Sequence, residues 1–234
     1  MCTSTPSRFL ESVSQKYGIP LYVRDGSPSL KEDWTFCLKE ALLLGAEAVT
    51  IAHQDDIYLP QYAGCIKRAF EDEDVLLAFT GAGNINASSE PVSGGAEKIK
   101  KILRFPLTVK LLNGSRFWKK ASLSFGNPVP CPACTYNVKK LGTELFSEKW
   151  RFVTDWDAVL KIAEKDGRIV CIEKPLVDIR LHDSQETMKI TESGARTEEE
   201  YEIFQTLHSA PAAKLLMHFY KKGQEEYLKD SSRK

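Results

Sequence analysis

The chain has no net charge, no long apolar run and no cysteine pattern of a disulfide-bonded scaffold. Each of these absences argues against a class of protein or partner. Its 32 Lys and Arg residues balance 32 Asp and Glu residues, so whole-molecule charge gives no reason to expect a nucleic-acid partner. No stretch approaches the roughly 20 apolar residues that a membrane span requires. The opening "MCTSTPSRFLESVS" also lacks the apolar centre of a signal peptide. We therefore expect a cytoplasmic protein.

The six cysteines are scattered, as is usual for reduced thiols in a cytosol. "CPAC" at 131–134 has the C-x-x-C spacing of a redox pair or of half a zinc site. A structural zinc site needs four ligands, and the chain has no second C-x-x-C pair to supply them. Three prolines, Pro128, Pro130 and Pro132, also place "CPAC" in a loop rather than at the start of a helix. Both roles are therefore disfavoured.

The order of apolar segments predicts an α/β fold with a Rossmann-like, mostly parallel sheet flanked by helices. Helical spacing over 7–17 and 31–44 alternates with short apolar runs over 46–52 and 75–83, which are typical of buried strands. A further helix is expected over 153–167 and two short strands over 168–187.

At 234 residues the chain suits one domain with an appended tail. We expect the domain to cover 1–195. A helical extension over 196–234, broken near Pro211, would pack back on it.

Acidic residues follow two of the expected strands. Asp25 comes after the strand in 19–27, and Asp55 and Asp56 come directly after the apolar run 46–52. Ligands of such sheets bind beyond the carboxyl ends of the strands. Position alone therefore makes these three residues candidates for a functional site.

An adjacent Asp pair taken alone is more often a turn with a helix cap than a metal site. Other polar residues at strand and helix ends favour the metal site here, namely Asp155, Asp157 and His182. A hard divalent cation binds carboxylate oxygens and offsets their mutual repulsion. The competing interpretation of Asp155 is a plain helix cap, and Thr154 is the other candidate for that cap. A lone His182 would otherwise be structural or exposed.

The segment 98–120 contains eight Lys or Arg residues and no acid, interleaved with apolar residues. One interpretation is an amphipathic helix with a solvated basic face. The other is a face that rests on an anionic membrane. Pro106 and Gly114 interrupt the segment, which argues against one long membrane-lying helix.

Six short motifs, taken in order, resemble bacterial family 2 glycosyltransferases, nucleotide-sugar transferases of the GT-A fold. The similarity covers roughly residues 19–190, and its weight comes from the order and spacing of the motifs. They are "YVRDGS", a following Trp34, "HQDDIYLP", "GNPVPCPACTYN", "TDWDAVLKIA" and "PLVDIRLHDSQET".

The resemblance implies a role for each matching position. Asp25 would contact the nucleotide base, and Asp55 would hold Mn²⁺ or Mg²⁺ on the donor diphosphate. Asp155 would be the catalytic base. Asp56 and His182 would add to the metal site, and the acceptor side would be formed by the loop 126–136 and its neighbours, including Asn127, Cys131, Trp156 and Asp157.

Two departures from the family pattern stand out. His53 occupies the place of the first acid of the family's D-x-D motif. The chain also starts at "MCTSTPSRF", where the family has an apolar strand, so we expect that the opening strand is missing. The Q-x-x-R-W motif of processive synthases is absent, which favours transfer of a single sugar.

The leading hypothesis is a metal-dependent inverting transferase that moves one sugar from a nucleotide-diphosphate sugar, a UDP-sugar first, to an acceptor hydroxyl. The acceptor would be a glycan or lipid-linked molecule in cell-surface polysaccharide or glycolipid assembly, with peripheral contact at the inner membrane face through 98–120. Two alternatives stay open. One is a truncated, inactive relative that binds a glycan or a partner, and the other is a nucleotidyltransferase, which usually needs a Gly-rich basic loop that the chain lacks.

Overall fold

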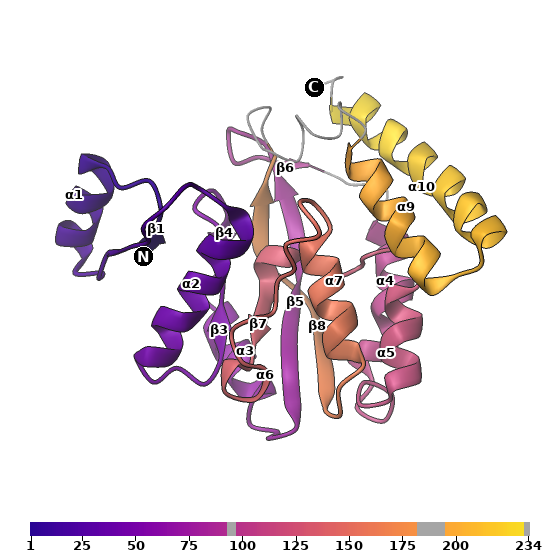
Figure 1. Cartoon of the computed structure of the whole chain (residues 1–234), viewed down its shortest axis with the longest axis horizontal. Helices are drawn as coiled ribbons and strands as arrows, with labels where there is room; N and C mark the ends of the chain where they lie inside the picture. Colours follow the sequence, from indigo (N-terminus) through magenta and orange to yellow (C-terminus); the bar gives the residue numbers. More distant parts are fainter. Residues whose placement is uncertain (93–96, 182–194, 232–234) are drawn as a thin grey trace.

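The computed structural model describes residues 1–92, 97–181 and 195–231 (Figure 1). The helices are α1 (Arg8–Tyr17), α2 (Leu30–Leu43), α3 (Tyr62–Ala69), α4 (Glu97–Thr108), α5 (Arg116–Leu123), the 3₁₀ turn η1 (Cys131–Ala133), α6 (Val138–Leu141), α7 (Thr154–Ala163), α9 (Ala195–Leu207) and α10 (Ala210–Ser231). The strands are β1 (Cys2–Thr3), β2 (Tyr22–Val23), β3 (Val49–Thr50), β4 (Ile57–Tyr58), β5 (Val75–Ile85), β6 (Pro91–Val92), β7 (Cys134–Tyr136) and β8 (Arg168–Arg180).

One six-stranded sheet organises the molecule, with strand order β3-β7-β5-β8-β4 and β6 added to β5. The expectation of a mostly parallel sheet is wrong. β5 and β8 form its only parallel pair among the described residues, whereas β7 pairs antiparallel with both β3 and β5, β4 with β8, and β6 with β5. The antiparallel strands are only two or three residues long, too short for a hydrophobic pattern to reveal their direction.

β8 is one strand of 13 residues rather than the two short strands expected around Lys174–Pro175. A shift in register opposite Gly81 accommodates the proline, as β-bulges commonly do. A side chain at Gly81 would place its Cβ only 2.6 Å from the carbonyl oxygen of Glu173. The bulge therefore requires glycine on the neighbouring strand.

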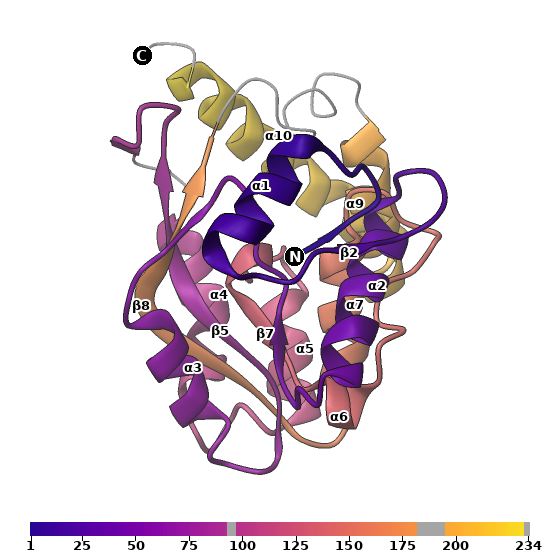
Figure 2. The ribbon, with the colours of Figure 1, turned by 90° about the vertical axis from the view of Figure 1, so that its left-hand side faces the viewer.

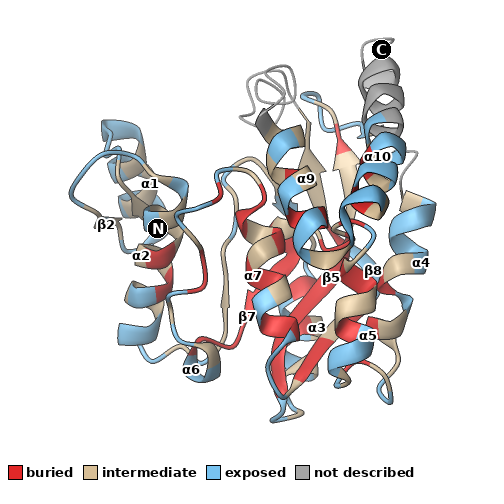
Figure 3. Ribbon diagram, turned by 45° about the vertical axis from the view of Figure 1, so that its right-hand side comes forward, coloured by how far each residue is buried: buried red, intermediate tan, exposed pale blue. Residues whose placement is uncertain are grey.

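The core lies on both faces of β5 and β8, and Figure 3 shows buried residues concentrated along these strands. The first seven residues of β5, "VLLAFTG", are all buried. Such a continuous apolar run fits a strand covered on both sides. This confirms the expected α/β layering.

A two-residue strand lies before α1. β1 (Cys2–Thr3) pairs in parallel with β2 (Tyr22–Val23) in a small separate sheet, which faces the viewer beside α1 in Figure 2. β1 lies outside the six-stranded sheet, so the expectation that the family's apolar opening strand is missing stays a prediction. Two residues followed closely by Pro6 give no alternation by which a strand could be recognised.

The two C-terminal helices pack on the α/β core and break near Pro211, as expected. The fully buried ring of Phe204 in α9 meets Trp156 of α7 edge to face, with ring centroids 5.3 Å apart. The Glu199 carboxylate of α9 accepts backbone hydrogen bonds from Arg151, Phe152 and Val153, just before α7. The tail thus stabilises the N-terminus of α7.

The segment 98–120 forms most of α4 and the start of α5, separated by a turn. A fully solvated basic face is not what the structure shows. Arg104 and Lys119 are buried, and the Lys119 ammonium donates to the carbonyl oxygens of Lys165 and Gly167 at 2.7 Å each. Within the described residues, no helix combines the length and apolar character needed to cross a bilayer.

Candidate active site

The loop that carries Asp55 and Asp56 crosses the sheet from one edge to the other. It leaves β3 at one end of the strand order and enters β4 at the opposite end. On the way it meets Arg180, the last residue of β8, and through Arg180 the turn that follows β5. The acidic pair therefore lies at the carboxyl ends of the two parallel strands, the expected location of a ligand site.

Arg180 fixes the shape of this loop. Its backbone N–H donates to Asp56 Oδ1 at 3.0 Å, and its guanidinium donates to the backbone oxygen of Asp55 at 3.0 Å. The same guanidinium reaches the carbonyl oxygens of Asn86 and Ala87 and the hydroxyl of Ser89. One side chain thus ties the acidic loop to the ends of both parallel strands.

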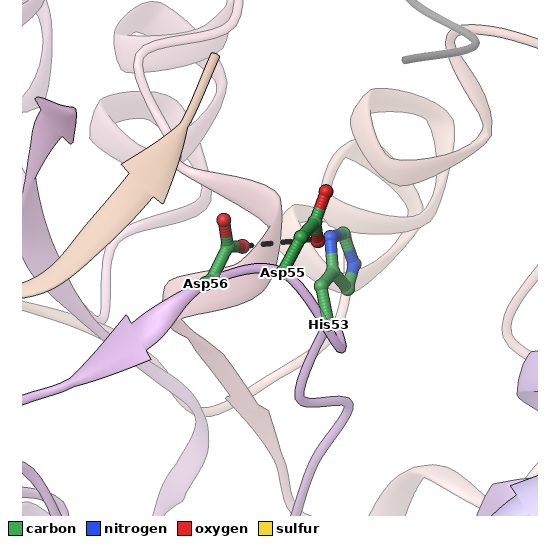
Figure 4. Close-up of side chains that lie close together, drawn as sticks. All are labelled: His53, Asp55 and Asp56. Atoms are coloured by element: carbon green, nitrogen blue, oxygen red, sulfur yellow. Dashed lines mark ion pairs between the residues drawn. The ribbon is translucent and has the colours of Figure 1, made fainter. Parts of the chain in front are cut away.

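His53, Asp55 and Asp56 form a compact cluster of metal-binding groups (Figure 4). Each offers one ligand atom, and these atoms all lie within 4.8 Å of one another. His53 Nδ1 lies 3.7 Å from Asp56 Oδ2, and the Asp56 side chain is only 3% exposed. Two carboxylates and an imidazole suit a divalent cation such as Mn²⁺.

The electrostatics of the cluster also fit a cation. Burial raises the pKa of Asp56 above its ordinary value, although the Arg180 backbone N–H and His53 oppose the rise. The buried His53 Nε2 has no hydrogen-bond partner among the described residues. A bound cation would compensate the buried charge of Asp56, and the imidazole could coordinate it as a ligand. The residues present therefore fit the divalent metal that the sequence predicts.

The indole ring of Trp34 in α2 packs against the His53 ring. The two rings stack with centroids 5.7 Å apart and planes 26° apart, and Trp34 in turn meets Phe146 edge to face. An imidazole packed on an indole loses rotational freedom before any ligand binds. The histidine that departs from the D-x-D pattern is thus placed as a metal ligand would be.

Asp155 lies in the first turn of α7, on a second part of the site. Its Oδ2 accepts a hydrogen bond of 3.0 Å from the Asn127 amide. Burial raises the pKa of Asp155, and the Trp156 backbone N–H and the Arg196 guanidinium oppose the rise. The predicted cap residue Thr154 makes no capping hydrogen bond, and Val153 is the N-cap.

The Cys131 thiol interacts electrostatically with both parts of the site. Burial raises the pKa of its thiol well above the ordinary value, and the negative charges of Asp155 and Asp56 raise it further. The thiol therefore lies within electrostatic range of both carboxylates. Burial likewise raises the pKa of Cys134. Both thiols stay protonated, which disfavours the thiolate that a redox pair or a zinc ligand needs.

Of the residues predicted for the acceptor side, Trp156 is buried in the core, whereas the role of Asp157 stays a prediction. Trp156 is 2% exposed, packs on Phe204 and donates from Nε1 to the Leu123 carbonyl oxygen at 3.2 Å. It is a core residue, because helical spacing alone cannot tell a side chain that faces the core from one that faces a site. Asp157 pairs with Lys161 one turn later at 2.6 Å. Asn127 does contact Asp155, and the Asp155 charge acts on the Cys131 thiol.

Asp25 lies in an open groove of about 870 Å³ beside the first half of α2. The residues that line the groove fall within 24–39, with Glu144 opposite, and the cluster residues are not among them. Its contact with a nucleotide base stays a prediction. His182 lies outside the described residues, so its place in the metal site also stays a prediction.

Sequence reasoning missed the contacts of Arg180 and the place of His53 as a candidate metal ligand. The spacing H-x-D-D could have suggested the second, because imidazole is a common metal ligand. No local signal marks Arg180, which lies 124 residues from Asp56 along the chain. Such a contact appears only when the fold is known.

No model of a protein family and no curated protein sequence matches the chain. Solved structures do match. Among them is that of TarS 1-349 from S. aureus in complex with UDP-GlcNAc, with a TM-score of 0.55 and 15% sequence identity over 97% of this chain. The two chains share a fold. The present chain spans 63% of that structure's length. The expectation of a glycosyltransferase-like α/β fold with a C-terminal helical tail is thereby confirmed.

Proposed function

We propose that this chain is a glycosyltransferase that uses a nucleotide-diphosphate sugar and a divalent metal. The observation that carries the proposal is the His53–Asp55–Asp56 cluster, held by Arg180 over the carboxyl ends of β5 and β8. It occurs in a chain with the fold of TarS, whose structure contains UDP-GlcNAc. A UDP-sugar is therefore the first donor to test.

In this proposal Asp55, Asp56 and His53 hold Mn²⁺ or Mg²⁺. The cation, when bound, neutralises the two phosphates of the leaving nucleotide diphosphate. Arg180 keeps the loop in place, and Trp34 keeps the imidazole oriented. The protein would thus contribute to donor activation by holding the three metal ligands in place before the cation binds. Asp25 would contact the nucleotide base.

Asp155 is the proposed catalytic base. Its raised pKa makes the carboxylate a stronger proton acceptor than an exposed aspartate, and the Asn127 amide orients it. It would take the proton from an acceptor hydroxyl as that oxygen attacks the anomeric carbon. Direct attack with one base inverts the configuration at that carbon. Transfer of a single sugar to a glycan or lipid-linked acceptor of the cell surface follows as the finer form of the proposal.

The test is donor binding and hydrolysis by the purified chain, with UDP-, GDP- and dTDP-sugars and with Mn²⁺ or without it. We expect at least one donor to bind and to hydrolyse slowly only when the cation is present. Asp55→Asn should abolish the donor binding and hydrolysis that depend on Mn²⁺. The matched control is Asp166→Asn, since Asp166 is 90% exposed and pairs with Arg116 at the surface.

A third variant separates an enzyme from an inactive binding protein. Asp155→Asn should still bind the donor, because Asp155 acts on the acceptor, but should lose transfer by about 10²–10⁴-fold, the usual contribution of a positioned base. Failure of every donor to bind in the presence of Mn²⁺ would refute the proposal.

A further inference from the structure

The outer surface of α4 and α5 carries a group of exposed apolar side chains. Six side chains define it, which we name the α4–α5 face: Ile99, Ile102, Phe105, Leu111, Phe117 and Trp118. Leu111 is 92% exposed, Ile102 74% and Phe117 70%. Single exposed apolar side chains are ordinary, but six within 20 residues of sequence on two adjoining helices mark an interaction surface.

The fold determines which side of these helices faces outward. The inner side of α4 is buried through Arg104 and Leu107, and that of α5 through Lys119 and Leu123. Ile99, Ile102 and Phe105 follow a three-residue spacing on the opposite side of α4. Phe117 and Trp118 meet edge to face at 5.2 Å on α5. Leu111 lies in the turn that joins the two helices.

Positive charge without a matching acid borders this face. Lys98 and Lys101 are exposed, and no described acid pairs with either of them. Glu97 is the only acid in 97–123, and it pairs with Arg104 at 2.5 Å. The other basic residues that have acidic partners pair with acids outside the segment: Lys110 with Asp72, Arg116 with Asp166 and Lys120 with Glu164.

We propose that the α4–α5 face docks on the surface of an anionic lipid bilayer. Phe and Trp side chains with flanking lysines are the composition of helices that lie in a membrane interface. A second copy of the chain fits less well, because a two-fold interface must be self-complementary. Here each copy would bring its lysines to a face that has no unpaired acid among the described residues.

The arrangement of the molecule allows such docking. In Figure 1, α4 and α5 lie on the side opposite to α1 and α2. The groove beside Asp25 is formed by 24–39 with Glu144, and the acidic loop joins β3 to β4, so neither is built from the docking helices. A membrane-bound protein could therefore still bind a soluble donor.

The experiment measures co-sedimentation of the purified chain with vesicles of phosphatidylcholine alone and of phosphatidylcholine mixed with phosphatidylglycerol. We expect binding to the mixed vesicles only, weakening as salt is added. Lys98→Gln and Lys101→Gln should each lower the affinity about fivefold. The double variant Ile102→Ser/Phe105→Ser should abolish binding.

Leu43→Ser is the matched control, since Leu43 is 81% exposed on α2 at the other side of the molecule. It should bind vesicles as the unchanged chain does. Circular dichroism of every variant checks that the fold is kept. Donor hydrolysis in solution should be the same for Ile102→Ser/Phe105→Ser and for the unchanged chain, so the result is separate from that for the proposed function.

Three outcomes would overturn the proposal. One is failure to bind anionic vesicles, and another is binding that the variants of the α4–α5 face do not alter. The third is a dimer in solution that Ile102→Ser/Phe105→Ser converts to a monomer, which would show that a second copy covers the face.

Discussion

The backbone N–H of Arg180 donates a hydrogen bond of 3.0 Å to Asp56 Oδ1, joining the end of β8 to the acidic loop. The Arg180 side chain adds a bond to the Asp55 carbonyl oxygen and three bonds to residues 86–89. The loop is therefore held from both parallel strands rather than by its own turn. The candidate metal site depends on a contact between distant parts of the chain.

Replacing Arg180 with alanine should weaken metal binding. The backbone bond to Asp56 stays, but the loop loses its attachment to Asp55 and to 86–89. Loss of a residue that orients metal ligands typically costs about 10–100-fold in metal affinity. Titration with Mn²⁺ followed by calorimetry measures the change. Arg68→Ala on the exposed side of α3 is the control, and equal affinities in both variants would contradict the role of Arg180.

Asp56→Asn should stabilise the metal-free protein at neutral pH. Because burial raises the pKa of Asp56, the folded state holds this proton more tightly than the unfolded state. Ionised Asp56 therefore lowers stability above its folded pKa, and the cost disappears as the pH falls toward its ordinary value of 3.8. The gain in Tm should shrink over the same range in thermal unfolding experiments.

Asp72→Asn is the control, because the pKa of Asp72 is shifted in the opposite direction to that of Asp56. Hydrogen bonds from Arg168 and Lys110 lower the pKa of Asp72, so its ionised form stabilises the fold above its ordinary value of 3.8, and the effect is lost as the pH falls through the lowered pKa. This variant should lower Tm at neutral pH and match the unchanged chain at the acid end. Parallel behaviour of Asp56→Asn and Asp72→Asn would contradict the assignment of the two shifts.

The sequence predicted the helices better than the sheet, for physical reasons. Helical spacing is local, so the helix expected over 7–17 matches α1, which Ser7 and Gly18 cap. Strand direction depends on which segments pair, and two-residue strands such as β3 contain no record of it. The position of the Asp pair at a strand end was also readable, because it depends only on an apolar run followed by carboxylates.

The site could be predicted from the sequence less well than the fold. Asn127 and Asp155 were both selected from motifs and do meet. Trp156 was misplaced because its neighbour in the core, Phe204, lies 48 residues away in a separate helix. The contact of Trp34 with His53 and that of Arg180 with Asp55 both form through tertiary packing, which a pattern in one segment cannot show.

Glu199→Ala should destabilise the chain through α7. The Glu199 carboxylate accepts backbone hydrogen bonds at 151–153, and loss of a comparable helix cap costs about 0.5–2 kcal/mol. Chemical denaturation monitored by circular dichroism measures the loss. The neighbouring Glu198 is exposed, so Glu198→Ala should change the unfolding free energy by less than about 0.5 kcal/mol. Equal effects in the two variants would refute the capping role.

Phe204→Ala tests whether the C-terminal helices belong to the folding unit of the α/β core. The fully buried ring contacts Trp156 and Tyr220, and such a truncation costs about 3–5 kcal/mol. We expect one cooperative transition at a lower denaturant concentration. Leu215→Ala, at a 59% exposed position of α10, should be nearly neutral. A separate transition for the tail, with the core unchanged, would show two independent units.

His53→Asp should change which metal the site prefers. An imidazole nitrogen binds Mn²⁺ more readily than Mg²⁺, which favours oxygen ligands, so the unchanged cluster should prefer Mn²⁺. The substitution makes all three ligands carboxylates and should shift the preference toward Mg²⁺, while the added negative charge loosens the metal-free loop. Competition of Mg²⁺ against bound Mn²⁺, followed by electron paramagnetic resonance, gives the ratio of affinities. His218→Asp adds the same charge on the exposed side of α10 and should leave the ratio unchanged. If His53→Asp also leaves it unchanged, the His53 imidazole is not a ligand.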